Sequence, residues 1–189
     1  MEESKIICDS DFVSSFLWAK EGNLLINLFE DKLFIPEAVI NEIGNLNNTK
    51  LGQFVYDDFQ NFLVNGSFKP LVISFGSEEE ELMETIRNDF YAQFGKKIGD
   101  GELEMITLAI HKQAMCIVNT ASNNMKDILT FIQSNQINNI TTMDVLCLAY
   151  DKNLKTFLEL ENIKAEMVKR KRWLPSLSVQ DYYNSIYKK

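Results

Sequence analysis

The residues that decide the fold are KIICDSDFV, at positions 5–13. The first four form a short apolar run bounded by polar residues, which is typical of a buried strand. Asp9 follows this run, and Ser10 or Asp11 can cap the helix that its apolar neighbours predict next. The stretch therefore predicts a strand that ends in carboxylates and leads directly into a helix.

The same alternation of strand and helix patterns continues along the chain. Further strands are predicted at 32–35, 71–75 and 115–118 and around Ile140, and helices at 23–29, from Pro36, at 51–64, 77–91 and 102–113, and around 145–148. Strands that alternate with helices imply a mainly parallel sheet covered on both faces, with right-handed crossovers. The predicted fold class is α/β.

The length of 189 residues and a hydrophobic content of 46% suit one core, and neither a linker nor an internal repeat divides the sequence. We therefore predict a single domain over residues 1–189, with a basic C-terminal segment of about 161–189 packed on it. No apolar run approaches the roughly 20 residues that span a bilayer. The acidic amino terminus lacks the basic region of a secretory signal, and these features favour a cytoplasmic protein.

The cysteines and the histidine limit the kinds of metal site. Cys8, Cys116 and Cys147 are widely spaced, and each lies within an apolar run, which indicates core thiols rather than a disulfide framework or a CxxC site. The only histidine, His111, lies in the predicted helix 102–113. Any metal site must therefore be built from oxygen ligands.

The net charge of −8 disfavours broad electrostatic binding of nucleic acid, because phosphate contacts need a basic surface. The distribution of charge favours local binding, since basic residues gather in the C-terminal segment. Candidate contacts for RNA phosphate there are Lys169, Arg170, Lys171 and Arg172. Bound divalent cations would also cancel negative charge where a phosphate must lie.

Acidic residues from separate stretches are expected to meet at one edge of the sheet, because the carboxyl ends of parallel strands open onto a common crevice. Asp9 ends the first strand, and Asp11 lies two residues further on. Glu42 lies two turns into the helix that begins at Pro36. Glu102 lies in the first turn of its own helix.

Three acidic stretches, taken together, resemble the motifs of the PIN family of nucleases. They are IICDSD (residues 6–11), IPEAVINEI (35–43) and GDGELEMITLA (99–109), in the order that the family has. The stretches ITTMDVL (140–146) and RWLP (172–175) also resemble closing portions of PIN-like proteins, so the resemblance covers nearly the whole chain.

The resemblance implies a PIN-like three-layer α/β/α sandwich on a mainly parallel sheet of four to five strands, whose acids bind Mg²⁺ or Mn²⁺ and cut single-stranded RNA. Two such cations about 4 Å apart can activate the attacking water and steady the leaving oxygen. The resemblance to the PIN family assigns catalytic and metal-binding roles to Asp9, Glu42 and Glu102. It assigns direct or water-mediated metal binding to Asp11 and Asp100.

The sequence departs from the family after the predicted strand 115–118, where members place a further acid. Residues 118–127 read VNTASNNMKD, with no carboxylate before Asp127. Asn119, Ser122 or Asn123 would supply a neutral ligand or a substrate contact there. This departure supports a second hypothesis, a catalytically silent PIN-like module that binds RNA or a protein.

The leading hypothesis is a metal-dependent endoribonuclease, with the toxin of a toxin–antitoxin pair as a candidate role. Its candidate partners are single-stranded RNA, an antitoxin protein and a second copy of the chain. No association with a membrane is expected.

Local structural roles compete with this hypothesis. Asp9 can be a helix cap, Glu102 can stabilise a helix dipole, and Asp144 fits a capping box with Thr141. A nucleotide-binding or receiver-type domain is a third interpretation, but neither GxGxxG nor GxxxxGK[ST] occurs and the motifs around Glu42 and Glu102 would stay unexplained.

Overall fold

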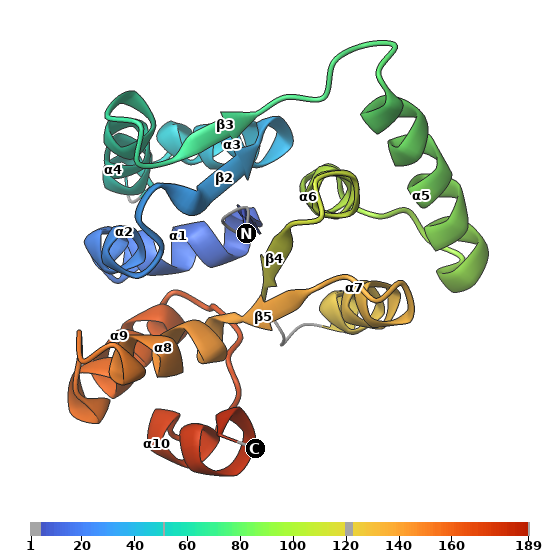
Figure 1. The fold of residues 1–189 in the computed structure, drawn as a ribbon. Helices are drawn as coiled ribbons and strands as arrows, with labels where there is room; N and C mark the ends of the chain where they lie inside the picture. Colours follow the sequence, from blue (N-terminus) through green and yellow to red (C-terminus); the bar gives the residue numbers. More distant parts are fainter. Residues whose placement is uncertain (1–4, 51, 120–122, 189) are drawn as a thin grey trace.

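A parallel sheet forms the middle layer of the protein (Figure 1). The computed structural model describes residues 5–50, 52–119 and 123–188, and over these residues five strands pair in the order β3-β2-β1-β4-β5. All four pairings are parallel. The strands are β1 (Ile6–Cys8), β2 (Leu33–Pro36), β3 (Lys69–Leu71), β4 (Met115–Val118) and β5 (Asn139–Thr141).

Helices cover both faces of the sheet and complete a three-layer α/β/α sandwich with a PIN-like fold, which confirms the predicted fold class. One face carries α1 (Ser10–Trp18), α2 (Gly22–Phe29), α3 (Glu37–Gly44), α4 (Gln53–Val64), α8 (Thr142–Asp151), α9 (Phe157–Lys169) and α10 (Val179–Tyr182). The other carries α5 (Glu78–Phe94), α6 (Asp100–His111) and α7 (Asn123–Ser134). Short turns are η1 (Glu30–Lys32), η2 (Asn45–Asn48) and η3 (Tyr183–Tyr187). Within the described ranges, no helix has the length and apolarity to cross a membrane.

The strands send successive side chains into two separate cores. In β1, Ile6 and Cys8 pack into the core under α1, whereas Ile7 packs into the core under α6. In β4, Ile117 and Cys116 divide in the same way. This alternation is the geometry of a pleated strand, and burial on both sides explains why the strands are uninterrupted apolar runs. All three cysteines are free and buried, as predicted.

Helix α1 begins at a different residue from the one predicted. Its N-cap is Asp9, whose backbone is extended (φ −83°, ψ 167°) and whose Oδ1 accepts a hydrogen bond of 2.6 Å from the N–H of Phe12. Ser10 and Asp11, the predicted caps, are the first two residues of the helix. The correction follows from the length of β1, because the strand ends at Cys8 and leaves the next residue in the extended conformation that an N-cap needs.

Strand β3 lies earlier in the sequence than predicted. The prediction placed it at 71–75, but β3 pairs Lys69 to Leu71 with the last residues of β2. The prediction followed the apolar residues, whereas Val72 and Phe75 are 59% and 96% exposed in the segment that leads to α5 (Figure 1). β3 is an edge strand, where Pro70 costs no ladder hydrogen bond if its nitrogen faces outward.

The C-terminal helices pack on the same face as α1. Leu160 and Met167 of α9 and Val179 of α10 are fully buried in the core that contains Phe12. A capping box of Thr156 with Glu159 begins α9. The turn after α9 brings Arg172 to Asp11, in the first turn of α1.

Candidate acidic site at the carboxyl edge of the sheet

Three elements bring acidic side chains to the carboxyl edge of the sheet. Asp9 directly follows the central strand β1. Glu42 lies in α3, the helix that follows β2, and Glu102 lies in the first turn of α6, which packs against α3. The strand order therefore places these three stretches at the same edge of the sheet.

Asp9 is the buried centre of this group. Its side chain is only 3% exposed, and while Oδ1 caps α1, Oδ2 has no hydrogen-bond partner among the described residues. The pKa of Asp9 is raised from 3.8 to about 8. Burial is the largest cause, and the charges of Asp11 and Glu102 add to it, whereas the backbone N–H groups of Phe12 and Asn119 act in the opposite direction. A buried carboxylate oxygen without a partner is costly, so a proton or a cation at this position would be strongly favoured.

Glu102 lies close enough to the other acids to feel their charge. Burial raises its pKa above 4.5, and Glu42, Asp11 and Asp100 raise it further, while its own backbone N–H acts in the opposite direction. Its carboxylate turns back against Gly99, the residue that caps α6. Glu102 therefore stabilises the start of its own helix and also contributes charge to the acidic group.

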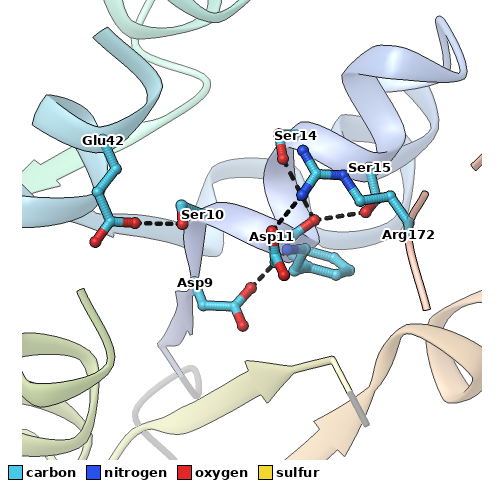
Figure 2. Close-up of polar contacts among 8 residues, drawn as sticks. Asp9, Ser10, Asp11, Ser14, Ser15, Glu42 and Arg172 are labelled. Atoms are coloured by element: carbon cyan, nitrogen blue, oxygen red, sulfur yellow. Dashed lines mark hydrogen bonds and ion pairs between the residues drawn. The ribbon is translucent and has the colours of Figure 1, made fainter. Parts of the chain in front are cut away.

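Glu42 reaches α6 because a glycine faces it. A Cβ atom built on Gly101 would lie only 2.8 Å from Oε1 of Glu42, so any larger residue would displace this carboxylate. The hydroxyl of Ser10 donates a hydrogen bond to Oε2 of Glu42 (Figure 2). Ser10 thus links α1 to α3, a contact that sequence reasoning missed because the same serine also fitted a cap.

Asp11 is paired with a basic residue from the far end of the chain. The guanidinium of Arg172, in the turn after α9, donates to Oδ1 of Asp11, and Figure 2 shows the two side chains meeting above the first turn of α1. Ser15 Oγ donates to the backbone carbonyl of Asp11 at 2.5 Å and supports that turn. One of the predicted phosphate contacts therefore neutralises one of the predicted metal ligands.

Asp100 and Glu104 lie with Glu42 at a second part of the acidic site, a cavity between helices. Together with Glu42, Glu37 and Arg87 they line a cavity of about 390 Å³ between α3, α5 and α6. Oε2 of Glu104 accepts a hydrogen bond of 2.9 Å from the N–H of Ala38 in the first turn of α3, and burial raises the pKa of Glu104. Glu104 therefore joins the two helices that carry the other acids.

The predicted neutral and basic positions have separate surroundings. Asn119 is buried at the end of β4 and lies beside Asp9. Ser122 and the side chain of Asn123 lie outside the described residues. Lys169 pairs with Glu166, and the guanidinium of Arg170 lies 5.0 Å from the centre of the Trp18 ring. Asp144 forms the predicted capping box with Thr141 on α8.

Carboxylate oxygens are the ligand type that suits a hard divalent cation. In this structure, however, the acidic side chains do not converge on one position. Among the residues that the structure describes, no three His, Cys, Asp or Glu side chains are placed to hold a metal ion together. Glu42 is engaged by Ser10, and Asp11 is engaged by Arg172. The Oδ2 of Asp9 has no hydrogen-bond partner in the described part of the chain, and the charge of Glu102 nearby raises the pKa of Asp9 further.

The parallel sheet and the helices on both of its faces define a three-layer α/β/α fold, which is consistent with a PIN-like fold. A search of protein-family models finds no match, and no curated protein is similar in sequence. Among solved structures, the chain is similar to the crystal structure of VapBC2 from Rickettsia felis bound to a DNA fragment from their promoter. The sequences are 17% identical, the match covers 72% of this chain and 98% of that one, and the TM-score is 0.50. This likeness supports the fold alone.

Proposed function

We propose that this protein is a divalent-cation-dependent endoribonuclease that cleaves single-stranded RNA. The observation that carries the proposal is Asp9, a buried acid with an unpartnered oxygen, raised pKa and the charge of Glu102 nearby, at the end of the central strand. Perturbed acids that lie together at the carboxyl edge of a parallel sheet are typical of a functional site.

In this proposal Asp9, Glu42 and Glu102 bind Mg²⁺ or Mn²⁺, and Asp11 and Asp100 assist directly or through water. The cation would supply an activated water and would stabilise the leaving oxygen of the phosphodiester. Gly101 leaves space for the Glu42 carboxylate, and Ser10 holds it. Asn119, buried beside Asp9, fits the role of a neutral ligand, with Ser122 and Asn123 as further candidates.

The toxin of a toxin–antitoxin pair is the biological role that we propose for this activity, in the cytoplasm. The choice follows from the resemblance of the three acidic motifs to the PIN family, and the solved structure of VapBC2 is similar in fold. An antitoxin protein and a second copy of the chain would then be partners. The free cysteines suit a reducing compartment.

A silent PIN-like module that binds RNA or a protein is the alternative, and two observations favour it. An amide, Asn119, follows β4 where the family has an acid, and Arg172 already neutralises Asp11. In such a module the acids would be retained for structure, with Asp9 protonated.

The deciding experiment incubates the purified chain with single-stranded RNA and Mn²⁺, beside Asp9→Asn, Glu102→Gln and a chelator control. Asp57→Asn, on the exposed face of α4, is a matched control for the loss of one negative charge. We expect cleavage by the wild type and Asp57→Asn only. Cleavage that persists in both site variants would point to a contaminating nuclease, and absence of cleavage and of thermal stabilisation by Mn²⁺ would favour the silent module.

A further inference from the structure

A basic cavity lies beside the acidic site. It has a volume of about 550 Å³, and its lining residues are Trp18, Thr49, Lys50, Lys169, Arg170, Lys171 and Arg172. Five of these seven residues are Lys or Arg and none is acidic, in a chain whose net charge is −8. This cavity therefore concentrates positive charge against the overall balance of the protein.

The cavity is built from three separate segments. Trp18 comes from the end of α1, Thr49 and Lys50 from the turn before α4, and the other cations from the end of α9 and the turn after it. The Trp18 ring packs edge-on against Phe54, with ring centroids 5.1 Å apart, and Arg170 lies over it. The floor of the cavity is therefore fixed by packing.

Two of the lining cations are available to a ligand. Lys50 and Lys171 are exposed, and no ion pair holds either of them within the part of the chain that the structure describes. Lys171 has a left-handed backbone (φ 60°), which marks the sharp turn after α9. Unpaired cations that are held on one concave surface form a site for an anion.

Arg172 connects this cavity to the acidic site. It lines the cavity and also pairs with Asp11, two residues from Asp9. Arg172 therefore lies between the basic cavity and Asp11.

We propose that the basic cavity binds the phosphate backbone of a single-stranded nucleic acid and leads the strand to the acidic site. The link to cleavage rests on the proposed nuclease function, but the binding itself does not. Trp18 lines the cavity, and Trp173, which is 68% exposed, follows Arg172 in the sequence. Cations beside exposed aromatic rings suit a strand with free bases better than an acidic peptide.

The test measures binding without cleavage, by the fluorescence anisotropy of a labelled 12-nucleotide single-stranded RNA in EDTA over a series of salt concentrations. The variant Lys50→Ala with Lys171→Ala removes two exposed cations from the cavity. Lys112→Ala with Lys188→Ala is the matched control, because both of these lysines lie on other elements and it removes the same charge. Thermal unfolding confirms that both double variants fold.

We expect the cavity variant to bind RNA at least about ten-fold more weakly. The slope of log K against the logarithm of the salt concentration should become shallower by about 1.4, or roughly 0.7 for each lost phosphate contact. The control should change affinity less than about two-fold. RNA should also quench tryptophan fluorescence, because Trp18 lines the cavity.

Equal weakening in both double variants would overturn the proposal, and so would displacement of the RNA by a poly-glutamate peptide at equal charge concentration. The two proposals fail separately. Weaker binding by the cavity variant together with no Mn²⁺-dependent cleavage would leave the binding site and refute the nuclease. Unchanged binding together with Asp9-dependent cleavage would do the reverse.

Discussion

Neutralising Asp9 should make the metal-free protein more stable, which is the opposite of what most buried substitutions do. The substitution Asp9→Asn keeps an oxygen that can accept the N–H of Phe12, so the cap of α1 survives. It removes a carboxylate that burial holds at a pKa of about 8. The stability of the variant should therefore exceed that of the wild type wherever the wild-type acid is forced to ionise.

The size of the effect follows from the two pKa values. A rise from 3.8 to about 8, at about 1.4 kcal/mol for each pKa unit, sets a ceiling of roughly 5–6 kcal/mol on the cost of ionising Asp9 in the folded chain. Water entry and side-chain movement reduce such costs, so we expect a gain of about 2–4 kcal/mol.

The sign of the pH dependence is set by the raised pKa. Because the folded chain holds this proton more tightly than the unfolded chain, its contribution to stability is fully present below about pH 4 and is lost as the pH rises to about 8. The difference in the free energy of unfolding between the wild type and Asp9→Asn should therefore grow as the pH rises from about 4 to about 8.

Urea unfolding in EDTA at pH 5 and pH 8.5 measures this difference. The wild type should lose more stability than Asp9→Asn between the two pH values. In a separate series without EDTA, Mn²⁺ at about 100 times its dissociation constant should return about 2.7 kcal/mol to the wild type alone. Parallel pH profiles for the two proteins, or a less stable variant at pH 8.5, would show that the Asp9 carboxylate is not strained in the folded chain.

The remaining predictions concern α6, the core and a cap. Gly101→Ala should leave the unfolding free energy within about 1 kcal/mol, because only the end of the Glu42 side chain must move, yet it should lower Mn²⁺-dependent RNA cleavage; unchanged cleavage would show that this glycine does not place Glu42. Phe16→Ala should cost about 3–5 kcal/mol in urea unfolding, since Phe16 is fully buried, and a loss under 1 kcal/mol would contradict its place in the core. Thr141→Ala should cost about 1 kcal/mol in the same assay by breaking the capping box of α8, and no loss would mean that the box adds nothing to stability.

The sequence predicted best those elements that local patterns control. β1 and β4 are uninterrupted apolar runs, and both occur within a residue of their predicted bounds. The helix start at Ser77 and the capping box of Thr141 with Asp144 were also correct, because each is formed by residues of a single turn. β3 was misplaced because an edge strand is chosen by pairing with β2, and hydrophobicity alone does not report that pairing.

The candidate site was also predicted only where local patterns report it. Acids that follow strands or begin helices could be found from the sequence, since their convergence follows from a parallel sheet. The contacts of Arg172 with Asp11 and of Ser10 with Glu42 join residues that are far apart in sequence, and no local pattern reports them. The metal-binding roles stay a prediction that the cation experiments must test.

The central position of β1 in the sheet bears on the order in which the protein folds during its synthesis. Ile7 pairs with Phe34 on one side and with Cys116 on the other, so the second neighbour of β1 is translated long after the first. Until residue 118 has left the ribosome, Asp9 lacks the wall that β4 provides and stays hydrated. The two walls around Asp9 are therefore completed only after β4 has been translated, well past the middle of the chain.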